Sequence, residues 1–153
     1  MPMLARRGLL ASLAGLPLAA PAIASDAVAR PTRVVQRADA DGQAFMREAL
    51  AMRRRAIGDG DRAYGAVVVK AGAIVGYGPS RVVTNQDPTA HAEMEAIRDA
   101  ARRLGTRDLS GCRMYSTSPP CRMCETAAYW ARLDRLLVGA AVTDRGAPRY
   151  SNC

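Results

Sequence analysis

A single histidine, a glutamate beside it and a later pair of cysteines are the residues of this sequence best suited to chemistry. His91 is the only histidine in the chain, and Glu93 follows it closely. A Cys-x-x-Cys motif, Cys121 to Cys124, comes further along the chain. Zinc in proteins is held by Cys, His and carboxylate ligands in a tetrahedron, and a catalytic zinc takes three ligands from the protein and leaves one position for water. His91, Cys121 and Cys124 make three ligands, so they predict a reactive zinc site.

Glu93 indicates what such a site would do. Two residues along a helix correspond to a rotation of about 200°, so Glu93 and His91 would not normally bind the same ion. Near the start of a helix, the Glu93 carboxylate can instead reach a zinc-bound water, take a proton from it and pass that proton to a leaving nitrogen. Zinc lowers the pKa of its water from about 15.7 to about 7, which makes hydroxide available at neutral pH. The expected chemistry is hydrolysis of a C–N bond.

Two other roles for the cysteines stay open. Cys121 and Cys124 could form a redox pair, which would need a strand-to-helix junction and reversible disulfide formation without metal. The zinc could also be structural, and it would then need a fourth protein ligand, for which Cys112 and Cys153 are the candidates. In an oxidising compartment the four cysteines could form two disulfides.

The elements that must position these residues are read from apolar spacing and from turn residues. Phe45, Ala49, Met52 and Ala56 recur at helical spacing, and Pro119-Pro120 separates a strand from a helix. We expect His91 and the two cysteines on the first turns of two different helices. The predicted elements, in order, are a helix capped by Asp41 or Asp39 and running to about Ile57, strands over 63–70 and 73–78, a helix opened by Pro88 and Thr89 and closed by Gly105, a strand over 112–118, a helix over 121–133 and a strand over 135–142.

This order predicts an α/β fold, a three-layer α/β/α sandwich with a mixed β-sheet. The first two strands form an antiparallel hairpin, and the last strand–helix–strand unit is parallel and right-handed. Helices then cover both faces of the sheet. The N-termini of the two site helices would converge on one metal if the strands before them are neighbours in the sheet. This domain is expected to occupy residues 41–153.

The site motif resembles that of a known superfamily. His91-Ala92-Glu93 together with the Pro-Cys-x-x-Cys of residues 120–124 is similar to the signature of the zinc-dependent cytidine deaminase-like superfamily. Residues 41–144 resemble that fold. The stretches "NQDPTAHAEMEAIR" and "CETAAYWARLDRLLVGA" look most like its nucleobase branch, which includes guanine deaminases and tRNA adenosine deaminases. The resemblance implies hydrolytic deamination of a nucleobase or nucleoside with release of ammonia.

The resemblance also assigns roles to single residues. It implies one zinc per chain on His91, Cys121 and Cys124, with water as the fourth ligand and Glu93 moving the proton. It implies substrate contacts from the backbone at Ala92. The side chains of Tyr64 and Trp130 would flank the base, although core packing explains both equally well. Family members are usually dimers, so a homodimer is expected.

The sequence departs from the family pattern at several points. Pro119 stands where members commonly have Glu, and Ser80 stands where many have an Asn that binds the base. Asn152 lies near the position of an Asp that helps proton transfer in guanine deaminase-like proteins. The chain also ends about where the family has a further helix. These changes leave open a tRNA adenosine deaminase, or a divergent member that binds zinc without catalysis.

Charge gives little support to a nucleic-acid partner. The net charge of the 153-residue chain is +8, and Lys70 is the only lysine. The one tight basic cluster, residues 53–55, occupies consecutive positions of a helix and therefore fans around it. A stripe of basic residues interleaved with aromatics, as expected for nucleic-acid binding, is not seen. We therefore expect a small-molecule substrate.

The N-terminal residues resemble an export signal. Arg6 and Arg7 precede an uncharged stretch that ends in Ala22-Ile23-Ala24, a pattern typical of signal-peptide cleavage. The apolar run is too short for a membrane span. Residues 1–24 are thus similar to a twin-arginine signal peptide, followed by a linker over 25–40, which implies the export machinery as a partner and a periplasmic or secreted protein. The alternative is a disordered tail. Because tRNA is cytoplasmic, export would argue against the tRNA substrate.

Overall fold

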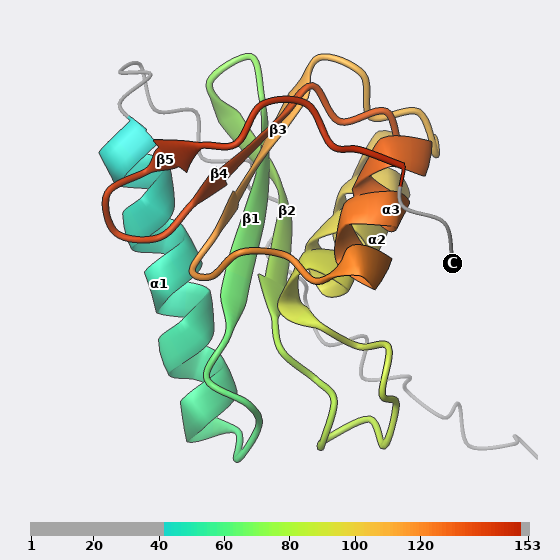
Figure 1. Cartoon of the computed structure of the whole chain (residues 1–153). Coiled ribbons are helices and arrows are strands. Elements are labelled where there is room, and N and C mark those ends of the chain that lie inside the picture. Colours follow the sequence, from blue (N-terminus) through green and yellow to red (C-terminus); the bar gives the residue numbers. More distant parts are fainter. Residues whose placement is uncertain (1–41, 151–153) are drawn as a thin grey trace, which may run out of the picture. The chain divides into compact units, whose positions relative to one another are not determined.

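The computed structural model describes residues 42–150, and within them it shows a mixed sheet with helices on both faces (Figure 1). The predicted signal peptide and linker, together with Asn152 and Cys153, lie outside the described residues. The elements in order are α1 (Gly42–Gly58), β1 (Gly65–Lys70), β2 (Ala73–Pro79), α2 (Ala92–Leu104), β3 (Cys112–Ser116), α3 (Arg122–Trp130), β4 (Arg135–Val138) and β5 (Thr143–Asp144).

The sheet has the strand order β2-β1-β3-β4-β5. Strand β1 pairs with β2 and with β3 in antiparallel fashion, whereas β3 and β4 run parallel. The predicted antiparallel hairpin and the predicted parallel pair are therefore confirmed. The short β5 pairs antiparallel with β4 at the edge of the sheet.

The three layers follow from β1, whose side chains are buried on both faces. Ala66 and Val68 belong to the core shared with α2 and α3, whereas Val67 and Val69 belong to the core shared with α1. Successive side chains of a strand point to opposite faces, so a strand covered on both sides is a continuous apolar run rather than an alternating one. In Figure 1, α1 lies on one side of the sheet and α2 with α3 on the other, which confirms the three-layer sandwich.

Glycines in the hairpin let the helices lie unusually close to the sheet. A Cβ atom on Gly65 would be 2.2 Å from the Ala49 carbonyl oxygen of α1, and one on Gly78 would be 2.0 Å from the Ala92 oxygen of α2. Real Cβ atoms do not approach backbone this closely, so both positions require glycine. Gly78 thus sets the distance between β2 and the first turn of α2.

The second helix begins later than the sequence predicted. Pro88 and Thr89 lie in a turn, where the Asp87 carboxylate accepts hydrogen bonds from the Thr89 N–H and hydroxyl at 2.7 Å each. Aspartate commonly bonds the backbone two residues on in this way, and the turn competes with helix. The helix therefore starts only at Ala92, and it ends as predicted at Gly105, whose φ of 66° is left-handed.

The C-terminal elements are shorter than predicted. Helix α3 ends at Trp130, and Arg132 follows with a left-handed φ of 61°. Strand β4 ends at Val138 because Gly139, with a φ of 70°, begins a turn. The return strand β5 was missed, since two residues are too few to show a period. Across the described range, no helix is both long enough and apolar enough to cross a membrane.

Candidate metal centre and cavity

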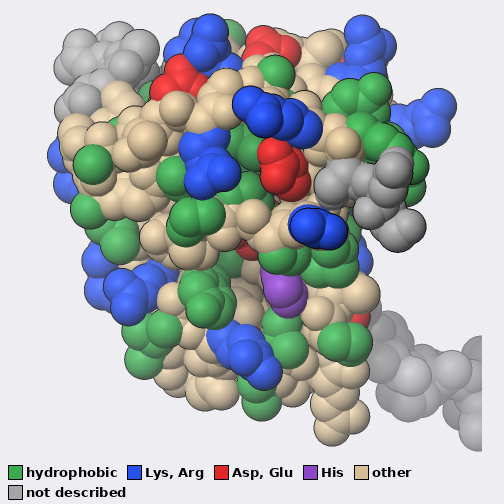
Figure 2. Space-filling model, in the orientation of Figure 1, with side chains coloured by type: hydrophobic (Ala, Val, Ile, Leu, Met, Phe, Trp, Pro, Cys, Tyr) green, Lys and Arg blue, Asp and Glu red, His purple; other side chains and the backbone are tan. Residues whose placement is uncertain are grey.

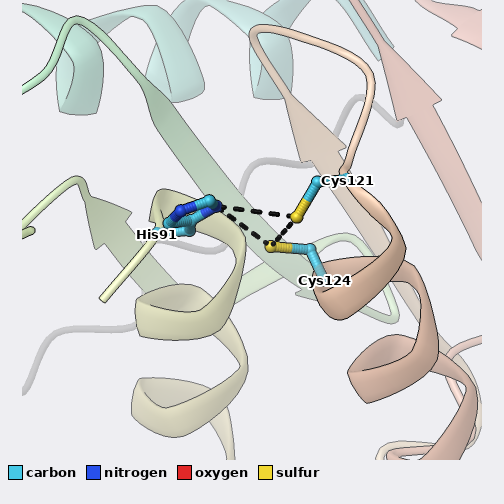
Figure 3. Close-up of side chains that lie close together, drawn as sticks. All are labelled: His91, Cys121 and Cys124. Carbon is cyan, nitrogen blue, oxygen red and sulfur yellow. Dashed lines mark hydrogen bonds between the residues drawn. The ribbon is translucent and has the colours of Figure 1, made fainter. Parts of the chain in front are cut away.

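Three potential metal ligands form a nearly equilateral triangle (Figure 3). The Nδ1 atom of His91 lies 3.7 Å from the sulfur of Cys121 and 3.7 Å from that of Cys124, and the two sulfurs are 3.6 Å apart. A tetrahedral zinc with bonds of about 2.3 Å to sulfur and 2.0 Å to nitrogen holds its ligand atoms about 3.5–3.8 Å apart. The triangle therefore has the size of one face of a zinc tetrahedron.

Helix starts place all three ligands. His91 caps α2 and Cys121 caps α3, both with extended backbone (ψ of 155° and 170°), and neither side chain bonds the end of its own helix. Their ring nitrogen and sulfur are thus left to face each other. Cys124 lies in the first turn of α3. Thiolates are favoured at this end of a helix because the macrodipole is positive there.

The two helices meet for a reason other than the one predicted. The strands before them, β2 and β3, are not neighbours, because β1 lies between them. The helices converge because both lie on the same face of the sheet. Alanines of each helix, among them Ala92, Ala96 and Ala128, share one buried core. Small side chains at these positions allow the two helices to lie close together.

Glu93 is buried against the triangle, with 5% of its surface exposed. Its Oε1 accepts a hydrogen bond of 2.8 Å from the hydroxyl of Ser116, and its Oε2 lies 3.6 Å from the Cys124 sulfur. Ser116 is the last residue of β3 and is itself buried. The sequence analysis missed this residue. The signal for it was a hydroxyl at the end of a strand in which every residue but Arg113 is buried.

The ligand group favours a cation. Burial raises the pKa of the Cys124 thiol, and the negative charges of Glu93 and Cys121 raise it further. The Cys124 thiol therefore resists ionisation when no metal is bound, whereas a bound divalent metal deprotonates coordinating thiols outright. Two sulfurs and one imidazole form a donor set that suits zinc. These residues fit a zinc ion.

A cavity of about 460 Å³ opens beside the triangle. His91, Cys121 and Glu93 contribute to its lining, and Tyr64, Val82, Pro88 and Pro119 supply apolar wall. Figure 2 shows the only histidine, in purple, at the surface of the molecule. The ligand triangle is therefore accessible from solvent through a pocket, as a catalytic rather than a closed structural site requires.

Of the predicted substrate contacts, Ala92 and Tyr64 line the cavity and Trp130 does not. Trp130 is 65% exposed and lines a separate hollow with Leu133 and Pro148. It ends α3, nine residues after Cys121, which is roughly 14 Å along the helix axis. The structure therefore places Trp130 outside this cavity, and its predicted contact with the base stays a prediction. Neither aromatic residue is a core residue, since Tyr64 is 47% exposed.

The other cysteine in the described range is not part of the group. Cys112 is a free, fully buried thiol at the start of β3, and burial raises its pKa. The metal-ligating cluster found among residues 42–150 contains His91, Cys121 and Cys124 alone. Cys112 is therefore not the fourth ligand that a structural zinc would need, and Cys153 lies beyond the described range.

The loop over the cavity is held in place by Asp61, a residue that the sequence analysis did not assign to the site. The Asp61 carboxylate accepts hydrogen bonds from the Ser80 hydroxyl at 2.8 Å and from the N–H groups of Val83 and Thr84 at 2.9 Å each. Burial alone would raise its pKa, but these bonds together with those from the Arg62 N–H and the Thr84 hydroxyl lower it well below its usual range. Asp61 therefore remains ionised, and it also engages the hydroxyl of Ser80, the residue that departs from the family asparagine.

Comparison with known proteins agrees with this geometry. The cytidine and deoxycytidylate deaminase zinc-binding region, as a family model, matches residues 39–140. The guanine deaminase of Bacillus subtilis (strain 168) is 48% identical over 81 residues, which cover 53% of this chain and 52% of that protein. The tRNA-specific adenosine deaminase of Aquifex aeolicus (strain VF5) is 42% identical over 96 residues, which cover 63% and 64% of the two chains.

The fold has a solved counterpart. The X-ray structure of guanine deaminase from Bacillus subtilis matches with a TM-score of 0.62 and 40% identity, over 64% of this chain and 63% of that one. The chain spans about half to two thirds of the length of the curated relatives it matches. The family match covers the metal ligands, Glu93 and the sheet that positions them. The chain belongs to the family defined by the cytidine and deoxycytidylate deaminase zinc-binding region.

Proposed function

We propose that this protein is a zinc-dependent hydrolytic deaminase that releases ammonia from a nucleobase or nucleoside, in the manner of a guanine deaminase. The observation that carries the proposal is the position of Glu93. Its carboxylate is buried beside the ligand triangle, at the wall of an open cavity, and Ser116 fixes one of its oxygens. A metal-binding group next to a held proton carrier is the arrangement that C–N hydrolysis needs.

Each residue of the site has a separate role in the proposed hydrolysis. His91, Cys121 and Cys124 would hold a zinc ion, which would supply Lewis-acid activation of a water molecule. The Ser116 hydroxyl donates to Oε1 of Glu93, and Oε2, which faces the Cys124 sulfur at 3.6 Å, is the oxygen that would accept and release the proton beside the metal group. Glu93 takes the proton of the attacking water and delivers it to the departing amine nitrogen. Tyr64 and the other apolar wall residues hold the flat base and exclude water from it.

A second candidate substrate is an adenosine within tRNA. It is favoured by the 42% identity to the tRNA-specific adenosine deaminase of Aquifex aeolicus. Both candidates use the same metal group and the same glutamate, and they differ only in what enters the cavity. A substrate panel that includes both separates them.

The test is ammonia release by the zinc-loaded protein. Guanine, adenine, cytosine, their nucleosides, the nucleoside 5′-monophosphates and a tRNA anticodon stem-loop are offered, first to the parent protein and then to Glu93→Gln. The variant is expected to lose about 10²–10⁴-fold in kcat, the usual contribution of a positioned proton carrier, while it still binds one zinc. The measurement is kcat together with metal content.

Glu95→Gln is the matched control. Glu95 lies on the same helix but pairs with Arg98 at 2.8 Å, and it does not line the cavity. It should keep parental kcat. Turnover that survives in Glu93→Gln would contradict the proposed role of Glu93, and absence of turnover on the whole panel by the zinc-loaded parent would contradict the proposed function.

A further inference from the structure

Within the described residues, the cavity wall contains one arginine, Arg62. The charged side chains that line the cavity are Arg62, His91 and Glu93. His91 belongs to the metal group, and Ser116 bonds Glu93. Arg62 is exposed, and over residues 42–150 its guanidinium makes no hydrogen bond or ion pair. An arginine that lines a ligand cavity and is not neutralised by the protein is available to a charge on the ligand.

The carboxylate next to Arg62 does not neutralise it. The two carboxylate oxygens of Asp61 accept hydrogen bonds from the neighbouring loop, whose donors include Ser80, Val83 and Thr84. It also accepts the Arg62 backbone N–H at 2.7 Å. The same aspartate therefore anchors the backbone of Arg62 while leaving the guanidinium unpaired.

The backbone of Arg62 is held on its other side as well. Its carbonyl oxygen accepts the N–H of Tyr64 at 2.7 Å, which closes a tight turn between the two cavity residues. Arg62 and Tyr64 thus stand together at the wall, one offering charge and the other an aromatic ring. A fixed backbone reduces the conformational freedom that a ligand contact must remove, so the site is partly preorganised.

We propose that Arg62 binds the phosphate of a nucleoside monophosphate, so that the preferred substrate of the cavity is a nucleotide rather than a bare base. This inference rests on the proposed deaminase function. The planar guanidinium matches a phosphate with paired charge-assisted hydrogen bonds. The cavity volume of about 460 Å³ lies within the range of roughly 300–1,000 Å³ that holds drug-sized ligands, which are larger than a base alone.

The geometry favours a free nucleotide over a nucleic-acid strand. Arg62 is the one Lys or Arg side chain in the cavity lining given by residues 42–150, which suits a single phosphate. A strand is bound through several phosphates along a basic groove. Blue Lys and Arg side chains are visible on the face shown in Figure 2, but they are separated by tan and green surface instead of forming one continuous band.

The test measures binding separately from turnover. The zinc-loaded full chain with Glu93→Gln, which binds without reacting, is titrated by calorimetry with three pairs of probes. These pairs are guanosine and its 5′-monophosphate, adenosine and its 5′-monophosphate, and cytidine and its 5′-monophosphate. In at least one pair the monophosphate is expected to bind about ten- to a hundred-fold more tightly, the usual gain from hydrogen bonds to a charged group. This ratio should fall in 0.5 M salt, because exposed charges are screened.

Substitutions test whether the tighter binding of the monophosphate is due to Arg62. In the same background Arg62→Ala is expected to remove the monophosphate preference, and Arg62→Lys to retain part of it, since it keeps the charge but loses the planar fork. Arg107→Ala is the matched control. Arg107 is exposed in the loop between α2 and β3, outside the cavity, so its removal should leave the ratio unchanged.

Three results would overturn the inference: equal affinity for nucleoside and monophosphate in all three pairs, a monophosphate preference that survives Arg62→Ala, or a short RNA that binds more tightly than every monophosphate. None of them concerns ammonia release. Parental turnover of a bare base without phosphate preference would leave the deaminase standing and remove only the role of Arg62. A monophosphate preference in a protein without turnover would leave the role of Arg62 standing and remove the deaminase function.

Discussion

At the scale of the residue, Asp61 shows how one carboxylate can hold a cavity wall. Five hydrogen bonds of 2.7–3.0 Å end on its two oxygens, from the Arg62 backbone and from Ser80, Val83 and Thr84. Four of these five bonds come from the loop after β2. The position of that loop over the cavity therefore depends on a side chain that touches no metal ligand.

Asp61→Asn tests this dependence. The amide loses one acceptor oxygen, so the free energy of unfolding at pH 7 should fall by about 1–3 kcal/mol. The folded pKa of Asp61 is depressed, so the stabilisation is fully present above the unfolded value of about 3.9 and is lost as the pH falls through the lower folded pKa. The difference between parent and variant should thus be constant from pH 7 to about pH 5 and shrink below about pH 4. Urea unfolding across this range measures it.

Asp59→Asn is the control for charge alone. Asp59 lies two positions away and makes only an exposed ion pair with Arg55 at 3.8 Å. Exposed pairs of this kind contribute about 0.2–1 kcal/mol or less. An equal loss of stability in the two variants would show that the hydrogen bonds of Asp61 do not hold the loop.

The residues of the site differ in how far the sequence could predict them. His91, Cys121 and Cys124 were predictable because metal binding requires particular donor atoms at particular spacings, and the structure brings them together. Ser116 and Asp61 were not, because serine and aspartate are common in loops and their roles arise from partners distant in the sequence. Trp130 lies outside the cavity because it ends α3, whereas the metal ligands stand at the start of that helix.

At the scale of the element, the distance between β2 and α2 sets the position of the metal ligands. His91 and Glu93 begin α2, and the backbone of that first turn lies against Gly78. Gly78→Ala would place a methyl group 2.0 Å from the Ala92 oxygen and 2.8 Å from the Ala96 side chain. The helix would have to move, and the ligand triangle would be distorted with it.

We expect Gly78→Ala to lower the free energy of unfolding by at least about 2 kcal/mol, because overpacking forces backbone shifts, and to weaken zinc binding as well. Chemical unfolding and competitive metal titration are the measurements. Gly58→Ala is the control, since a Cβ at this last residue of α1 meets nothing within 4 Å and alanine favours helix. Zinc affinity in Gly78→Ala equal to that in Gly58→Ala would exclude the proposed coupling between β2 and the site.

The elements were largely predictable because their signals are strong and local. The apolar run of β1 marks a strand that is covered on both faces, and the helical spacing of α1 predicted the end of that helix to within one residue. The boundaries that failed have tertiary or turn causes. Asp87 draws the start of α2 into a turn, and β5 exists only through its pairing with β4. A local pattern carries no information about either.

At the scale of the whole molecule, the metal group joins two helices that are otherwise connected through the core alone. Removal of zinc by a chelator is expected to lower the unfolding temperature of the parent protein. A ligand that binds only the folded state contributes about 4 kcal/mol when present at a thousand times its dissociation constant. Calorimetric scans with and without chelator measure the shift.

Two cysteine variants make that experiment specific. Cys121→Ser removes a ligand at an exposed helix cap, so its unfolding temperature should respond little to chelator. Cys112→Ser perturbs a buried strand position and should be less stable with or without metal, yet it should keep the full zinc-dependent shift. A zinc-dependent shift retained in Cys121→Ser would exclude this triangle as the stabilising site.

The triangle has a further consequence for the unfolded chain. His91 and Cys121 are 30 positions apart, and all of α2 and β3 lie between them. A link between such positions acts as a reversible cross-link that closes a loop. If it persists during unfolding, it removes chain entropy worth about 3–4 kcal/mol on the scale used for disulfides. A chain that bound zinc through these residues before folding would search fewer conformations, with the central strand β3 already confined close to the helix it must meet.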